Sequence, residues 1–162
     1  MAVHEALNER DRGEGTPHTV TAPIIGPQTY ARWRATTLGA ITERVETAVV
    51  FDLAGPLDGK RVLDVGTGDG TYALEASARG AIVTALDSSA DMLAAARHRA
   101  GQGRAPLTLA QGRAEELPFE DSSFDVVLGV TVLCLGADAR VVVHEMARVV
   151  APGAVEFAVG IE

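Results

Sequence analysis

Short apolar segments alternate with longer amphipathic segments over most of this chain. The apolar segments are rich in Val, Leu and Ala, and they lie at residues 61–65, 81–86, 107–110, 124–130 and 154–159. Apolar positions at helical spacing occupy residues 71–79 and about 88–101, and they return between Asp138 and the Pro152-Gly153 pair. Strands that alternate with helices in this way predict βαβ units and a parallel sheet. Because the strands are almost wholly apolar, we expect helices on both faces of that sheet.

The chain before residue 57 follows a different pattern. Residues 1–27 are polar and interrupted by Gly and Pro, which predicts a mobile tail. A helix is predicted from Leu38 to the Gly55-Pro56 pair. Its apolar face comprises Leu38, Ile41, Val45, Ala48 and Val49, with Thr42, Glu43, Arg44 and Glu46 outside. We therefore divide the chain into a tail (1–27), a lid and helix (28–56) and a core (57–162).

Right-handed crossovers between such strands predict an α/β fold, a Rossmann-like doubly wound sheet of about five parallel strands. Ligands bind such sheets beyond the carboxyl ends of the strands, at the point where the strand order reverses. Three features should therefore share one rim, namely the turn at residues 66–70, Asp87 and the segment after Ala110.

Composition removes several classes of function. The 162 residues suffice for one domain, and a net charge of -8 argues against a protein that grips nucleic acid. The single cysteine, Cys134, excludes an internal disulfide framework and a Cys-rich zinc site, and we expect it to act as a small hydrophobe. With no membrane-spanning run and no secretory signal, we expect a cytoplasmic protein. The arginines at 97, 99 and 104 are interpreted as a solvated face.

The strongest motif is the run Val62-Leu63-Asp64-Val65-Gly66-Thr67-Gly68-Asp69-Gly70. It places three glycines at alternate positions between a strand and a helix, where they permit unusual backbone angles and close approach of a ligand. The dinucleotide fingerprint would instead have its third glycine at Thr71. The acids Asp64 and Asp69 disfavour a pyrophosphate and favour a cationic amine or sulfonium. The alternative is a glycine-rich connection that binds nothing.

Asp87 ends the second predicted strand, 17 residues after Gly70. A carboxylate at this point can accept hydrogen bonds from both hydroxyls of a ribose, as acids do in nucleotide-binding βαβ units. The alternative is an aspartate that caps the next helix or is simply solvated.

Over residues 57–159 the chain resembles the class I S-adenosylmethionine-dependent methyltransferases, in the small-molecule branch similar to ubiquinone and menaquinone biosynthesis enzymes. The resemblance is carried by residues 62–70 and 87–92, by the loop at 111–119, by Phe124-Asp125-Val126-Val127, and by the turn at 147–153. It implies S-adenosylmethionine as cofactor and a small-molecule methyl acceptor.

The resemblance also implies roles for individual residues. Asp64 and the backbone of Gly66, Thr67, Gly68 and Gly70 would hold the methionine moiety, and Asp87 would hold the ribose. The adenine would lie beside Ser88 and Met92 and near Ala114, with Arg113 where the family often has an acid. Val130 and Thr131 would lie near the sulfonium, and Tyr30 would cover the methionine end, with Trp33 and Arg34 as weaker lid candidates.

Methyl transfer requires mainly proximity and orientation, so we assign no catalytic side chain. The four histidines, at positions 4, 18, 98 and 144, are interpreted as structural or surface residues.

Family members normally continue through a helix and two further strands, which this sequence lacks. The missing strands predict an exposed edge on the fifth strand and a possible homodimer through it. Two alternatives therefore stay open beside the enzyme: a shortened module that binds the donor or S-adenosylhomocysteine without useful turnover, and a partner that completes its sheet on another chain.

Overall fold

The computed structural model describes residues 26–103, 105–134 and 138–159 of the chain. Its sheet contains five parallel strands in the order β3-β2-β1-β4-β5. The strands are β1 (Arg61–Val65), β2 (Ile82–Asp87), β3 (Leu107–Gln111), β4 (Phe124–Val130) and β5 (Val150–Val159). The predicted α/β class and parallel sheet are confirmed. The strand order reverses between β1 and β4, so the carboxyl end of β1 lies at the switch point.

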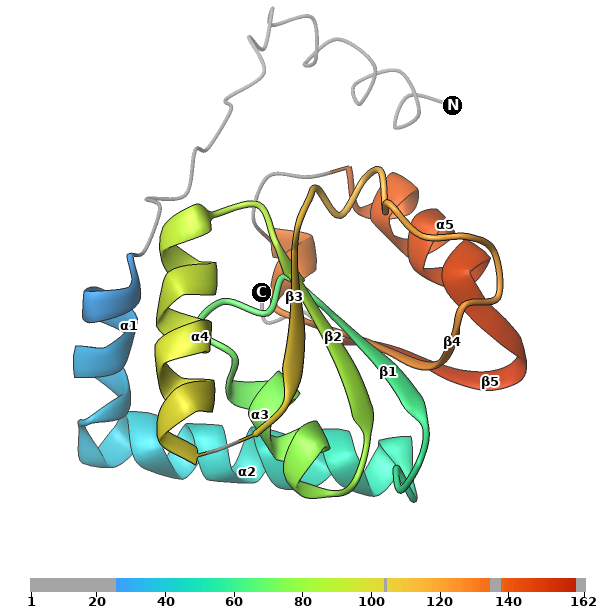
Figure 1. Ribbon diagram of the computed structural model, residues 1–162. Helices are drawn as coiled ribbons and strands as arrows, with labels where there is room; N and C mark the ends of the chain where they lie inside the picture. Colours follow the sequence, from blue (N-terminus) through green and yellow to red (C-terminus); the bar gives the residue numbers. More distant parts are fainter. Residues whose placement is uncertain (1–25, 104, 135–137, 160–162) are drawn as a thin grey trace, which may run out of the picture.

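Helices cover both faces of the sheet. They are α1 (Pro27–Arg34), α2 (Thr37–Ala54), α3 (Thr71–Ala78), α4 (Ala90–Gly103) and α5 (Ala139–Val149), with a short 3₁₀ turn η1 at Val132–Cys134. Figure 1 shows α1 to α4 together on one side of the sheet and α5 on the other. As predicted, Asp138 caps α5, and the buried residues of this helix are Val142, Met146 and Val149.

The core has two parts, one on each face. Successive residues of a strand point to opposite faces, so Val126 and Leu128 of β4 join the cluster under α2 and α3, whereas Val127 joins the cluster under α5. All three side chains are inaccessible to solvent. Burial on both faces explains why β4 reads as an almost unbroken apolar run.

The predicted orientation of α2 is wrong, although its bounds are close to those expected. The side chains that enter the core are Val50, Phe51 and Ala54, with Gly39 close against α1. The expected apolar face is turned outward, and its large members are exposed together with Leu53, at fractions of 48–70% for Leu38, Ile41, Val45, Val49 and Leu53. The buried face includes Phe51, whose ring packs against Tyr72 of α3 with ring centroids 6.5 Å apart.

Two boundaries also differ from the prediction. Pro27 occupies the first turn of α1 rather than ending a tail, which suits its fixed φ and missing N–H. The fifth strand begins at Val150, so Pro152 and Gly153 lie inside it. They fall where its register with β4 shifts, since Phe124 pairs with Val150 but Val126 pairs with Val155. The shift accommodates a proline that cannot donate to a regular ladder.

Among the described residues, no helix is long and apolar enough to cross a membrane. Residues 1–25, which include most of the predicted tail, lie outside the described part of the chain.

Candidate functional site

The glycine-rich turn joins β1 to α3 at the switch point. Its glycines Gly66, Gly68 and Gly70 have φ angles of 71°, 55° and 87°, in the left-handed region that favours glycine. The N–H groups of Gly66 and Thr67 donate to the Leu86 carbonyl at 2.8 and 2.9 Å, which ties the turn to the end of β2. A Cβ on Gly66 would lie 2.8 Å from Cγ2 of Val132, whereas one on Gly68 would meet nothing within 4 Å. The turn is therefore packed at Gly66 and open at Gly68.

Asp64 lies under this turn and is 1% exposed. Its Oδ2 accepts a hydrogen bond of 2.6 Å from the Thr67 hydroxyl. Burial raises the pKa of Asp64 to about 6, because the charged form is poorly solvated there, and the hydrogen bond from Thr67 opposes part of that rise. The carboxylate is thus held in a fixed position with little water to stabilise its charge.

Asp87 stands beside the turn at the end of β2. Its Oδ2 accepts from the Gly68 N–H and its Oδ1 from the Ser89 N–H, both at 2.8 Å. A carboxylate oxygen can accept more than one hydrogen bond, so each oxygen retains acceptor capacity. Asp87 therefore ties the turn to the start of α4 and still presents acceptors at the rim.

The segment after β3 is joined to the same rim, as predicted. The Gly112 N–H donates to the Asp87 carbonyl at 3.1 Å, and the Gln111 amide donates to the Ser88 carbonyl at 3.1 Å. Met92 is half-buried on the first turn of α4, and Ala114 is half-buried in the loop after β3.

Arg113, which stands where the family named above often has an acid, pairs with a residue close to it in the sequence. Its guanidinium donates to Glu115 at 2.6 Å, and its side chain is 71% exposed.

Val130 is buried at the end of β4, where it pairs with Val159 of β5. Thr131 follows with a φ of 59°, an uncommon conformation for a β-branched residue. This bend leads into η1, whose Val132 packs against Gly66. The chain after β4 thus packs against the glycine-rich turn at Gly66.

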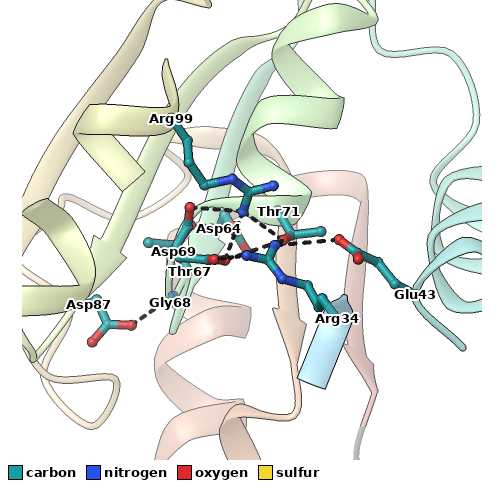
Figure 2. A network of polar contacts seen from close by, with 9 residues as sticks. All are labelled: Arg34, Glu43, Asp64, Thr67, Gly68, Asp69, Thr71, Asp87 and Arg99. Carbon is teal, nitrogen blue, oxygen red and sulfur yellow. Dashed lines mark hydrogen bonds and ion pairs between the residues drawn. The ribbon is translucent and has the colours of Figure 1, made fainter. Parts of the chain in front are cut away.

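A network of polar contacts closes the remaining side of the turn (Figure 2). Asp69, the second acid of the motif, is 3% exposed. Arg34 of α1 forms an ion pair with one of its oxygens, and Arg99 of α4 donates to the other at 2.8 Å. The interpretation of Arg99 as part of a solvated face is wrong, because its side chain is 31% exposed and directed at Asp69. Arg97 is exposed, as expected.

Tyr30 belongs to the same region. The guanidinium of Arg34 lies 5.0 Å from its ring centroid, and the ring stacks on Trp33 at 5.7 Å. Burial, together with the negative charge of Asp69, raises the pKa of the Tyr30 hydroxyl. The sequence indicates Arg34 only as a weaker lid candidate and points to no partner for Asp69. The acid inside the turn was visible, but no spacing rule connects it to residues 35 positions earlier and 30 later.

The histidines at 98 and 144 are exposed, in agreement with the surface interpretation. The residues at 4, 18 and 104 and the side chain of Cys134 lie outside the described part of the structure.

Comparison with known proteins agrees with this geometry. A family model described as "Methyltransferase domain" matches residues 63–157. A fatty-acid O-methyltransferase of Mycolicibacterium smegmatis is 41% identical over 99 residues, which cover 60% of this chain and 35% of that protein.

Among solved structures, the YcgJ protein of Bacillus subtilis superimposes with a TM-score of 0.66 at 29% identity, over 68% of this chain and 48% of its own. A SAM-dependent methyltransferase of Aquifex aeolicus gives 0.66 at 21% identity, over 78% and 68%, a likeness that shows the fold alone. Among the most similar curated relatives, the matched region covers between 22% and 51% of the relative's own length.

Proposed function

This chain belongs to the methyltransferase domain family, and from that premise we propose that it binds S-adenosylmethionine at the switch point and transfers the methyl group to a small-molecule acceptor. The observation that carries the proposal is the pair of carboxylates, Asp64 and Asp87, on either side of a turn that is open at Gly68.

The chemistry of these groups suits the proposed donor. Asp64 is a buried acid whose charge lacks a basic partner among its described hydrogen bonds, so a bound ammonium would stabilise it. Asp87 can accept hydrogen bonds from ribose hydroxyls while its two backbone donors hold it in place. The absence of a Cβ at Gly68 leaves room for a ligand against the backbone.

The adenine would then lie along the rim beside Ser88 and Met92 and near Arg113 and Ala114. The methionine end would lie between the turn, Val130 and Tyr30. These roles come from the family resemblance, and the hydrogen bonds that join Gln111 and Gly112 to residues 87 and 88 support them, because they hold both sides of the rim together.

When bound, the donor supplies a methyl group already activated by its sulfonium. The residues of this chain then bind the donor, orient it and exclude water, which is a contribution of proximity and orientation. Water exclusion falls to the walls formed by η1 on one side and α1 on the other.

Calorimetry with S-adenosylhomocysteine tests the donor site. We expect wild-type protein to bind and Asp87→Ala to weaken binding by about 100-fold, since a charge-assisted pair of hydrogen bonds contributes about 3 kcal/mol. Asp52→Ala is the matched control, because Asp52 is an exposed aspartate on α2. Wild-type protein that binds no S-adenosylhomocysteine would overturn the proposal.

A methyl-transfer assay then separates an enzyme from a binding module. The acceptor panel should contain small carboxylic acids, phenols, quinones and amines, and it should include long-chain acids because of the similarity to a fatty-acid O-methyltransferase. Binding of S-adenosylhomocysteine without transfer to any acceptor would favour the module that binds without turnover.

A further inference from the structure

Polar contacts from Arg34 join α1 to α2, to α3 and to the glycine-rich turn. None of its eight described residues is buried, and Trp33 is 38% exposed. A helix this short is not stable by itself in water, and this one lacks a buried apolar face to compensate. Besides the close packing of Gly39 of α2 against its backbone, α1 is therefore fixed beside the glycine turn by side-chain interactions such as those of Arg34.

Asp69 is the centre of those interactions. Its carboxylate is shared between Arg34 and Arg99, and the Asp69 carbonyl accepts a second bond from Arg99 at 3.1 Å. The Thr71 hydroxyl, at the first position of α3, accepts from Arg34 at 2.7 Å and from Arg99 at 2.9 Å. Glu43 of α2 adds an ion pair to Arg34 at 3.5 Å. One buried acid thus links α1 and α4 across the turn (Figure 2).

The hydrogen bonds of this network are strong, but one buried donor in it lacks a partner. Charge-assisted hydrogen bonds between partly buried groups are stronger than neutral ones. However, within the described part of the chain the Arg34 Nε atom is buried without a hydrogen-bond partner. A buried donor without a partner is unfavourable, which lowers the free energy needed to open the network. Segments with few buried apolar contacts are also those that open most readily.

We propose that Arg34, Asp69 and Arg99 form a latch that holds α1 over the glycine turn and sets the rate at which the donor leaves the site. The latch rests on the proposed function, since it controls access to that same site. Its three members are positioning residues. Arg34 lies over the ring of Tyr30, so closing the latch also fixes Tyr30 beside the turn.

The chain carries its own reporter, because Trp33 is its only tryptophan and lies in α1. Quenching of its fluorescence by acrylamide measures the exposure of α1 without any ligand. Stopped-flow displacement measures the rate at which S-adenosylhomocysteine dissociates.

The variants to compare are Arg34→Gln and Arg99→Gln, with Arg61→Gln as the control. Arg61 also donates to a carboxylate, Asp125, but at the opposite end of β1. We expect each latch variant to release S-adenosylhomocysteine about tenfold faster and to raise the quenching constant of Trp33 at least twofold. Arg61→Gln should change neither quantity. Arg34→Lys, which keeps the charge, should give a dissociation rate and a quenching constant between those of Arg34→Gln and those of the wild type.

Circular dichroism and the melting temperature establish that each variant is folded. Arg34→Gln with wild-type quenching and a wild-type dissociation rate would overturn the latch. Wild-type protein that binds no S-adenosylhomocysteine would instead overturn the proposed function, and the quenching comparison would then still decide whether the latch holds α1.

Discussion

At the carboxyl edge of β1 the acidic side chains accept hydrogen bonds or ion pairs from other parts of the protein, whereas the outer face of α2 leaves large apolar side chains in solvent. Asp64 accepts from Thr67, Asp87 accepts from two backbone N–H groups, and Asp69 holds two arginines. On α2, by contrast, the row Ile41, Val45, Val49 and Leu53 is about half exposed at every position.

The difference separates a region whose geometry is fixed by internal contacts from a region whose large apolar side chains stay exposed. The turn has packed walls and fixed hydrogen bonds, so its geometry follows from contacts within the described chain. A contiguous exposed apolar row is unusual on a protein that works alone. Within the described structure the row belongs to neither buried cluster, so we expect it to contribute little to the stability of the donor side. Comparing variants on the two faces of α2 tests this directly.

The largest expected effect is at Phe51. Phe51→Ala removes a ring that is 2% exposed and packs against Tyr72, so we expect the free energy of unfolding to fall by about 4 kcal/mol. Val45→Ala, on the outer face of the same helix, should change it by less than about 0.5 kcal/mol. Urea unfolding followed by circular dichroism measures both. A large loss in Val45→Ala would mean that the outer row is covered in solution.

The next effect compares two glycines with similar backbone angles. Gly66→Ala combines a φ of 71° with a close contact to Val132, and we expect a loss of about 3 kcal/mol with much weaker binding of S-adenosylhomocysteine. Gly153→Ala has a φ of 80° but meets nothing within 4 Å, so only about 1 kcal/mol should be lost, with binding retained. Equal losses would show that backbone strain, and not packing against η1, makes glycine necessary at position 66.

The glycine-rich turn and α2 also show how much of the fold the sequence could predict. The strands β1 and β4 have the predicted bounds, because alternating burial on two helix-covered faces leaves a direct apolar record. The turn was predicted from its glycines, which answer a local backbone requirement. The orientation of α2 was not, since apolar residues lie on both of its faces and periodicity alone cannot say which face is buried.

The latch escaped prediction for a related reason. Arg34, Asp69 and Arg99 come from three elements, and ion pairs between distant elements leave no spacing in a sequence. Without an apolar pattern, α1 itself was not predicted as a helix, although Pro27 at its first turn is a start signal. The edge of β5 as a dimer contact stays a prediction, which sedimentation analysis of the wild-type protein can test.

We expect the charge of Asp64 to lower the free energy of unfolding, although the proposed site requires that charge. Its pKa is about 6 in the folded protein against an ordinary 3.8, so its charge opposes folding above pH 6. We expect Asp64→Asn to be more stable than wild type by about 2 kcal/mol at pH 8. That advantage should shrink as the pH falls from 6 to 3.8, because the folded wild type then takes up its proton. The same variant should bind S-adenosylhomocysteine at least tenfold more weakly.

Binding by the wild type should also fall below pH 6, as Asp64 loses the charge that would face the donor's ammonium. Calorimetry at pH 5, 6, 7 and 8 measures this dependence. A pH-independent affinity in the wild type would exclude Asp64 as the group that holds the ammonium.

The smallest effect is expected at Glu145, which lies on the other face of the sheet and whose pKa is shifted in the opposite direction to that of Asp64. It accepts from Arg148 and from the Leu117 N–H, each at 2.8 Å, and the hydrogen bonds from Arg148 lower its pKa from 4.5 to about 2. The charge therefore stabilises the fold above pH 4.5, and this contribution is lost between pH 4.5 and 2. Glu145→Gln should reduce the free energy of unfolding by about 1 kcal/mol at pH 7 and by almost nothing near pH 2.

Urea unfolding across this pH range compares the free energy of unfolding of wild type with that of Asp64→Asn and Glu145→Gln. The two differences from wild type should have opposite signs. If both differences had the same sign, the buried acid at the turn would be stabilising the fold like any paired surface acid, and its poor solvation could no longer be taken as a mark of the site.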